Sequence, residues 1–250
     1  MDTRVQSVVR PILTSLSRKL CQLSFDVPVQ YTINPLLYAM EPHLSYWDIM
    51  GLQTGRILLL GMNPGPWGMP QTGVPFGDVS MVQNWFGMNA DVSSDIKSHP
   101  KRPITGFSCT RAEVSGRRLW GWAAERYRTP QAFFSQFALY NYCPLVFLED
   151  SGRNRTPDKL PAREKDGLFA ACDDALRSIH ALLKPTMVIG IGRFAEGRAR
   201  STFPNANVGY LLHPSPSSRR ANSGWIVQAE QQLRTMGIDL PSVHVRKTLR

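Results

Sequence analysis

The sequence has few acidic residues and no long apolar run. Nineteen Asp and Glu residues stand against 29 Lys and Arg residues in 250, which gives a formal net charge of +10 and a pI near 9.8. This excess of cations favours a polyanionic partner, nucleic acid before an anionic membrane surface, over a merely soluble basic protein. No apolar segment approaches membrane-spanning length, and the first ten residues lack the apolar core of a signal peptide. We therefore expect a soluble protein that stays inside the cell and does not bind membranes.

Cysteine is also scarce. Cys21, Cys109, Cys143 and Cys172 form no CxxC pair, and no histidine stands at zinc-ligand spacing from them. This pattern is typical of free, mostly buried thiols in a reducing compartment. We expect no metal and no cofactor, because nothing in the sequence supports an iron–sulfur cluster built from four distant cysteines.

Short apolar segments alternate with amphipathic ones along the chain. Buried strands are predicted at residues 57–60, 137–143, 187–191 and 208–212. Helices are predicted at residues 5–23, after Asp78, at 115–128, in the stretch that ends at Leu183, and from Trp225 onward. Pro11 is expected in the first turn of the first helix or at a break in it, and Asp78 is expected to cap its helix.

Strands that alternate with helices imply crossover connections and a mostly parallel sheet between helical layers. We therefore predict an α/β fold, a three-layer sandwich with a central four-stranded, mostly parallel sheet. One domain is expected over residues 1–250, with an N-terminal helix within 1–25 packed on it and a loose basic tail at 238–250. Residues 29–47 are expected to wrap the sheet edge in short pieces, and 89–110 and 151–161 to form polar loops.

A stiff loop follows the first predicted strand. Residues 62–77 contain four glycines and four prolines, together with Met62, Asn63, Met69 and Phe76. A rigid, semi-apolar loop at the end of a buried strand is where α/β proteins place a site, although it is also compatible with an elaborate structural turn.

Three polar side chains are predicted to meet beside this loop. Asn63 follows the first strand, Asn141 lies in the second, and His213 follows the fourth. Parallel strands bring their carboxyl ends to one edge of the sheet, so these residues can converge on one crevice. Taken singly, Asn141 would more often be a strand-end hydrogen bonder and His213 a satisfied structural histidine.

Four segments together point to a known family. They are GMNPGPWGMPQTGVPFG at 61–77, NYCPL at 141–145, SGRN at 151–154 and LLHPSP at 211–216. They resemble the single-strand-selective monofunctional uracil-DNA glycosylase family. The resemblance implies the uracil-DNA glycosylase-like fold and a base-excision repair enzyme. Such an enzyme hydrolyses the N-glycosidic bond of uracil, and of C5-oxidised uracils such as 5-hydroxymethyluracil, in single- or double-stranded DNA. It leaves an abasic site and has no lyase activity.

The chemistry of the residues agrees with this resemblance. The Asn141 amide can pair with the N3–H donor and the O4 acceptor of uracil, whereas cytosine inverts that pattern. The Asn63 amide cannot take a proton at neutral pH, so it can only orient the attacking water. By resemblance, His213 hydrogen-bonds uracil O2 and stabilises the charge on the departing base.

The resemblance also implies roles for the remaining loop residues. Phe76 stacks on the base, Gly65 and Met69 line its C5 side, and Met62 belongs to the substrate-binding set. The family's DNA-penetrating loop corresponds to Pro214, Ser215, Pro216, Ser217, Ser218, Arg219, Arg220, Ala221, Asn222, Ser223 and Gly224. This sequence departs from the family at Trp67, where the family has Phe, and at residues 217–220, which differ from its usual wedge sequence.

Two other readings stay open. The glycines Gly190, Gly192 and Gly197 are spaced too widely for a GxGxxG dinucleotide loop, and there is no GK[ST] motif, so a nucleotide-binding enzyme is disfavoured. A catalytically silent DNA-damage binder would use the same basic face, and only base release separates it from a glycosylase. We expect a monomer that acts on DNA in the nucleus, or in the cytoplasm if the source is bacterial.

Overall fold

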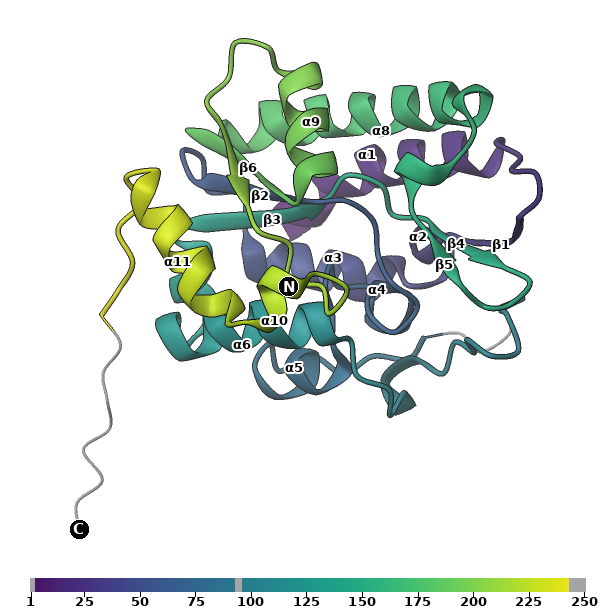
Figure 1. Cartoon of the computed structure of the whole chain (residues 1–250), viewed down its shortest axis with the longest axis horizontal. Coiled ribbons are helices and arrows are strands. Elements are labelled where there is room, and N and C mark those ends of the chain that lie inside the picture. The colour runs from purple at the N-terminus through teal and green to yellow at the C-terminus, as the bar shows by residue number, and fades with distance from the viewer. Residues whose placement is uncertain (1–2, 93–95, 243–250) are drawn as a thin grey trace.

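The computed structural model describes residues 3–92 and 96–242, and its main feature is a parallel β-sheet between layers of helices (Figure 1). The sheet order is β3-β2-β6-β7, and every neighbouring pair is parallel. The strands are β2 (Ile57–Gly61), β3 (Phe137–Asn141), β6 (Met187–Ile191) and β7 (Val208–Leu211). The predicted three-layer α/β sandwich with a four-stranded sheet is therefore confirmed.

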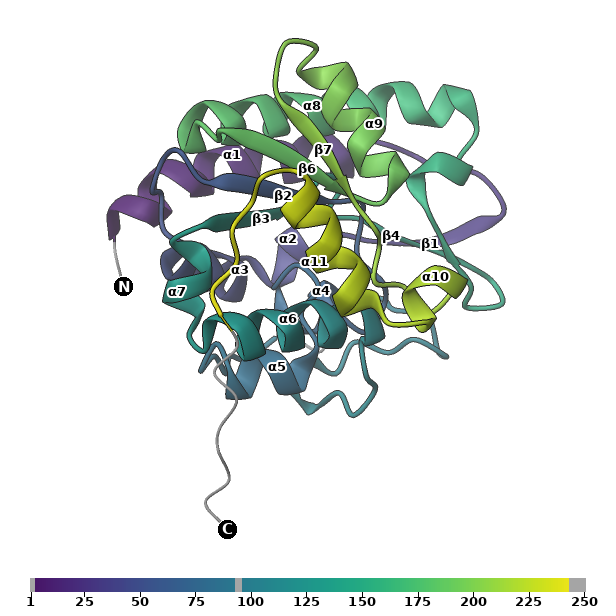
Figure 2. The same ribbon diagram turned by 60° about the vertical axis from the view of Figure 1, so that its left-hand side comes forward.

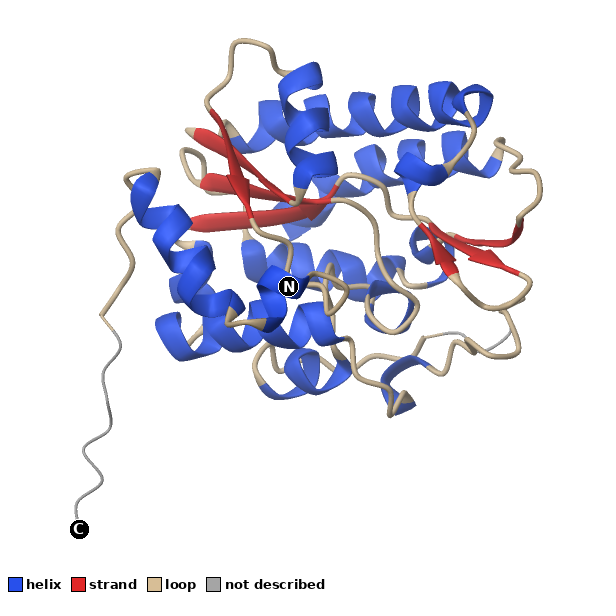
Figure 3. Cartoon of the chain, in the orientation of Figure 1, coloured by secondary structure: helices blue, strands red, loops and turns tan. Residues whose placement is uncertain are grey.

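Helices cover both faces of this sheet (Figures 1 to 3). One side carries α1 (Thr3–Cys21), α8 (Ala162–Leu183) and α9 (Arg193–Thr202). The other carries α3 (Met40–Met50), α6 (Val114–Tyr127) and α11 (Trp225–Thr235). The shorter helices are α2 (Pro35–Tyr38), α4 (Met69–Thr72), α5 (Val79–Asn84), α7 (Pro130–Phe134) and α10 (Arg219–Asn222), with 3-10 turns η1 (Gly106–Ser108) and η2 (Pro157–Lys159). Within the described residues, no helix is both long and apolar enough to cross a lipid bilayer.

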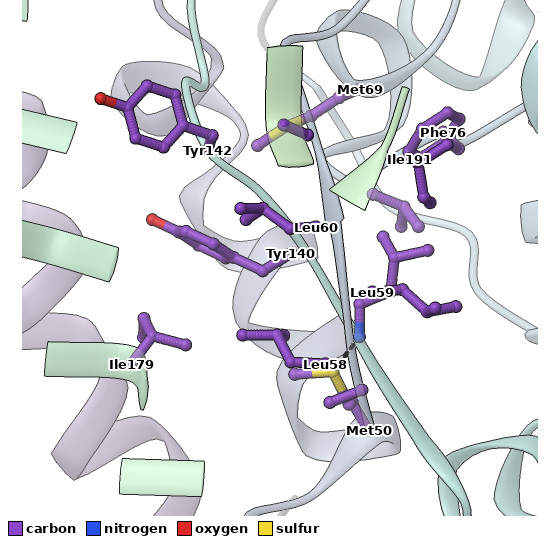
Figure 4. Close-up of a cluster of buried hydrophobic side chains, with 14 of the residues drawn as sticks. Met50, Leu58, Leu59, Leu60, Met69, Phe76, Tyr140, Tyr142, Ile179 and Ile191 are labelled. Carbon is purple, nitrogen blue, oxygen red and sulfur yellow. Dashed lines mark hydrogen bonds between the residues drawn. The ribbon is translucent and has the colours of Figure 1, made fainter. Parts of the chain in front are cut away.

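The centre of the sheet is buried on both faces. Leu58, Leu59 and Leu60 of β2 are at most 1% exposed. Figure 4 shows that Leu58 and Leu60 lie on the side of Tyr140, whereas Leu59 lies on the side of Ile191. This alternation is the two-residue period of a strand, and a strand covered on both faces must be apolar at every position.

A second, antiparallel sheet was not predicted. It contains β1 (Val29–Ile33), β4 (Val146–Glu149) and β5 (Asn154–Arg155), with β4 in the middle. The expectation that residues 29–47 only wrap the sheet edge is wrong for β1, which pairs with β4. The sequence signal for this sheet was weak for two reasons. Strand β5 has only two residues, and β4 begins two residues after Pro144, where the sequence pattern predicted that the preceding strand ends.

Helix α9 was also missed, for a packing reason. Its sequence RFAEGRARST has little apolar surface, and only Ala195 and Ala199 are buried. The helix approaches β6 so closely that a Cβ atom on Gly190 would lie 2.0 Å from the Glu196 backbone nitrogen. Small residues at this contact replace the apolar stripe by which an amphipathic helix is usually recognised.

The ends of the chain differ in detail from the expectations. Helix α1 runs through Pro11 without a break, so this proline lies inside the helix rather than in its first turn. At the other end, Ile238 is 6% exposed and the Pro241 carbonyl accepts a 2.9 Å hydrogen bond from Arg126 Nη1. Ile238 and the Pro241 backbone are therefore anchored to the body of the protein, and residues 243–250 of the predicted tail lie outside the described residues.

Candidate active site

The carboxyl ends of the parallel strands surround a cavity of about 440 Å³. Most of the site residues predicted from the sequence line it: Met62, Asn63, Gly65, Met69, Phe76, Asn141, His213, Ser215, Pro216, Ser217 and Ser218. The cavity lies at the edge of the sheet that open α/β folds use for ligands, because strands β2, β3 and β7 are parallel and all end at this edge. The structure thus brings together the three polar residues that the sequence pattern placed at the strand ends.

The Asn63 side chain is fixed in one orientation by the backbone. Its Nδ2 donates to the Leu145 carbonyl at 3.0 Å, and more weakly to the Pro64 carbonyl at 3.4 Å. Its Oδ1 is buried and has no partner among the described residues. Because a carbonyl oxygen can only accept, this anchoring turns the amide so that its oxygen is free to accept a hydrogen bond inside the cavity.

Asn141 lies at the end of β3, in register with Gly61 of β2. Its side chain is 4% exposed, its Nδ2 lies 3.9 Å from Met69 Sδ, and its Oδ1 has no partner among the described residues. A Cβ atom on Gly61 would stand 2.2 Å from this Oδ1 and 2.8 Å from Phe76 Cε2. The glycine therefore makes the room in which the amide and the Phe76 ring sit.

Gly61→Ala should move both side chains and lower any catalytic turnover in this cavity by about 10- to 100-fold, because displacements of about 1 Å have effects of this size. We expect only a moderate loss of melting temperature, since the atoms in conflict are ends of side chains. Gly121→Ala on α6 is the matched control, because a Cβ atom there meets nothing within 4 Å. Equal activity of the two variants would contradict the role given to Gly61.

His213 follows β7 and is held by the turn after it. The Ser215 backbone N–H donates to His213 Nδ1 at 3.0 Å. Burial lowers the pKa of His213 to about 4, so the ring is neutral at pH 7. Because Nδ1 accepts a hydrogen bond, the single proton of the neutral ring lies on Nε2, where it can be donated to a ligand.

Phe76 is held in a strained conformation against helix α6. Its φ of 55° lies in the left-handed region, which is uncommon for an aromatic residue. Trp120 Nε1 donates to the Pro75 carbonyl at 3.1 Å, and Gly116 lies so close that a Cβ atom there would overlap the Phe76 carbonyl. The ring centroid is 5.8 Å from that of His213. Strain of this kind is found where the backbone must aim one side chain, here into the cavity.

The predicted DNA-contacting segment 214–224 is tied to the body of the protein. Arg118 of α6 donates from Nη1 to the Pro214 carbonyl at 3.0 Å and from Nη2 to Asn222 Oδ1 at 2.9 Å. Arg219 and Arg220 are exposed on the short helix α10. Ala221 is 2% exposed, so its side chain is not free to contact DNA and the expectation for this residue is corrected. Arg118 itself was not recognised from the sequence.

Four polar residues of the cavity were not predicted: Glu113, Ser115, Asn154 and Thr156. The Glu113 carboxylate caps α6 by accepting from the backbone N–H groups of Ser115 and Gly116. Burial, its largest influence, raises the pKa of Glu113 to about 7. Glu is not among the residues preferred at a helix N-cap, and nothing in the sequence shows that this helix starts at the cavity.

The raised pKa of Glu113 predicts a change of stability with pH. An unfolded chain releases this proton near pH 4.3, whereas the folded chain keeps it up to about pH 7, so stability falls as the pH rises between these values. Glu113→Gln should remove this fall, and its melting temperature should rise relative to the wild type between pH 5 and pH 8. Glu125→Gln, at an exposed position of the same helix, is the control. A difference in melting temperature that does not change with pH would contradict the assignment.

Metal-ligating residues do not cluster in the described part of the chain. There, no group of three or more His, Cys, Asp and Glu side chains could hold a metal ion. The four cysteines are free thiols that form no disulfide, with Cys109, Cys143 and Cys172 buried and Cys21 exposed.

The site is thus a cavity at the carboxyl edge of a parallel sheet, with two oriented amides, a neutral histidine and an aromatic ring. Comparisons with known proteins show to which family of proteins this chain belongs. The family profile of the Uracil DNA glycosylase superfamily matches residues 50–234. The single-strand selective monofunctional uracil DNA glycosylases of Mus musculus, Rattus norvegicus and Bos taurus are each 45% identical over 227 residues. These alignments cover 89% of this chain and 81%, 82% and 84% of the mouse, rat and bovine proteins.

A solved structure supports the fold. The crystal structure of wild-type SMUG2 from Pedobacter heparinus aligns with a TM-score of 0.63 at 16% identity, covering 90% of this chain and 97% of that one. The chain belongs to the uracil-DNA glycosylase superfamily and, within it, to the single-strand-selective monofunctional uracil-DNA glycosylase family.

Proposed function

We propose that this protein is a DNA base-excision repair glycosylase that flips uracil out of DNA and hydrolyses its N-glycosidic bond. The observation that carries the proposal is that Asn63, Asn141 and His213, which come from three different strand ends, line one cavity. An enzyme that acts on a base must take it out of the stack into such a pocket, at a cost of a few kcal/mol.

Asn141 is the residue that selects uracil. Its amide offers an acceptor for N3–H and a donor for O4, and its Oδ1 is buried without a partner in residues 3–92 and 96–242. Cytosine would place an acceptor against the amide oxygen and a donor against the amide nitrogen. The unpaired buried groups would then disfavour cytosine strongly, because a site built to hydrogen-bond one pattern rejects its inverse. Phe76 covers the face of the base.

Asn63 and His213 have different roles in bond cleavage. Asn63 Oδ1 accepts a hydrogen bond from a water molecule and orients its oxygen toward the sugar carbon as the glycosidic bond breaks. The sugar develops oxocarbenium character and negative charge collects on the departing base. His213 Nε2–H donates to uracil O2 and stabilises this charge. No lysine nucleophile takes part in this scheme, so the product is an abasic site with no lyase step.

The loop residues Gly65 and Met69 line the C5 side of the base in this proposal, and Met62 completes the wall. Glycine leaves space beside C5, because a Cβ atom on Gly65 would have only Glu113 Oε1 near it, at 4.0 Å. We infer that substituents at C5, such as the hydroxymethyl group of 5-hydroxymethyluracil, are accepted.

The segment around α10 is the proposed DNA contact. It includes Ser215 to Ser218 at the cavity mouth and the exposed pair Arg219 and Arg220. Arginines beside a wedge can hold phosphates while the loop fills the gap left by the flipped base. The protein would act as a monomer, without a cofactor, on single- or double-stranded DNA in the nucleus, or in the cytoplasm of a bacterial source.

The test is direct detection of the released base. Oligonucleotides that differ only by uracil, 5-hydroxymethyluracil, thymine or cytosine at one position are incubated with the protein, and free base is quantified by mass spectrometry. We expect release of uracil and 5-hydroxymethyluracil and none of cytosine. Binding without release from any of them would instead favour a silent damage binder.

A further inference from the structure

Trp67 belongs to a loop that lines the cavity, and two arginines lie over its ring. It stands in the loop from β2 to α4, next to Gly68, which lines the cavity. The guanidinium carbons of Arg102 and Arg111 lie 5.2 Å and 5.4 Å from the centroid of its partly exposed ring. Both are at cation–π distance, and indole is the side chain best suited to that contact. No carboxylate of residues 3–92 and 96–242 forms an ion pair with either arginine.

Arg102 joins this loop to the turn between β4 and β5. Its Nε donates to the Gly152 carbonyl at 3.0 Å, and the neighbouring His99 ring bonds the Asp150 carbonyl at 2.7 Å. The turn leads into Asn154, which lines the cavity and whose Oδ1 is buried with no partner in the described chain. Arg102 thus links the Trp67 loop to the turn that leads into Asn154, and we call Trp67, Arg102, Arg111 and Asn154 the Trp67 rim.

The charge of the rim fits a polyanion. Lys101 and Arg153 are exposed beside Arg102 and Gly152, and Arg111 is exposed as well. The Trp67 rim reaches the cavity through Asn154, and the segment 215–218 lines the cavity from a different part of the fold. A strand whose nucleotide enters the cavity must pass over its border on either side of that nucleotide.

We propose that the Trp67 rim binds the nucleotide of single-stranded DNA next to the flipped one. The exposed Arg111 guanidinium leaves the indole to hold its phosphate beside Arg102, and its base stacks on the part of the ring that Arg111 leaves. An aromatic platform inside a basic track is how proteins bind single strands without sequence preference. A duplex keeps the neighbouring base in its own stack, so the contact favours single strands. The inference rests on the proposed function, since it needs a nucleotide in the cavity.

The experiment compares Arg111→Gln, Trp67→Ala and Trp67→Phe with Arg18→Gln, an exposed arginine of α1 that does not line the cavity. KM and kcat are measured on a single-stranded uracil oligonucleotide and on its duplex at several salt concentrations. We expect Trp67→Ala to raise KM for the single strand about 10-fold with little change in kcat, and Trp67→Phe to lie between it and the wild type. Arg111→Gln should lower the slope of log affinity against log salt by about 0.7, the value for one phosphate contact.

Unchanged KM and salt dependence in Trp67→Ala and Arg111→Gln would overturn the proposal, and so would an equal loss on duplex and single strand. Because Arg111 is exposed, its variant is expected to fold even if a change at Trp67 disturbs the loop. Affinity for an unmodified single strand, measured by fluorescence anisotropy, does not depend on catalysis. A wild-type protein that releases no base would therefore refute the proposed function while the anisotropy still tests the rim.

Discussion

Asn63→Ala lowers the rate of uracil excision by at least about 100-fold and leaves the affinity for uracil-containing DNA close to that of the wild type. The expected magnitude follows from the role proposed for Asn63, which is to position the attacking water. Single-turnover rates on a uracil oligonucleotide measure the chemical step, and anisotropy with the same oligonucleotide measures binding.

The structure explains why binding should survive this substitution. The Asn63 amide makes its protein contacts with the Leu145 and Pro64 carbonyls, and neither carbonyl belongs to the residues assigned to the base. Losing them costs about 1 kcal/mol of stability, so the variant is expected to fold. Asn89→Ala, at an exposed position that does not line the cavity, is the control. Turnover of Asn63→Ala equal to that of this control would remove the water-positioning role.

His213→Asn lowers excision by about 100- to 1,000-fold, the usual effect of removing one donor to a developing anion. Asparagine can still accept the Ser215 N–H in place of Nδ1, so the turn is preserved, but it has no group at the position of Nε2. His213→Gln carries an amide nitrogen that can reach that position, and we expect it to recover part of the activity.

Two measurements separate catalysis from folding in this pair. Similar melting temperatures of the two variants would show that the turn is intact in both. Because the pKa of His213 is lowered to about 4, its contribution in the wild type should be constant between pH 6 and pH 8. A rate for His213→Asn equal to that of the wild type would contradict the leaving-group role.

The predictable part of this fold is the part with strong periodicity. Strand β2 is apolar at four consecutive positions and ends in Gly61, and the long α8 has a regular stripe of buried residues, so both were identified from the sequence. Once the strands were parallel, the convergence of Asn63, Asn141 and His213 followed from topology alone. The rule that parallel strands end at one edge is what made the centre of the site predictable.

The missed residues depend on contacts between segments far apart in the chain. Glu113 reaches the cavity because α6 packs against the Phe76 loop through Gly116, and Asn154 because a two-residue strand pairs with β4. Helix α9 lacked an apolar stripe because its contact with Gly190 requires small residues. Ala221 was included with its neighbours in the DNA-contacting segment, but α10 turns its side chain inward. Local sequence pattern carries no information on any of these contacts.

The most direct test of the account is an end-labelled oligonucleotide with a single uracil, incubated with the purified protein in the presence of EDTA and then divided in two. One half is treated with hot alkali, which breaks the strand at an abasic site, and the other is not. The account predicts strand breakage only after alkali, with a loss of that breakage in Asn63→Ala and His213→Asn. Breakage without alkali, or no breakage in either half despite binding, would contradict it.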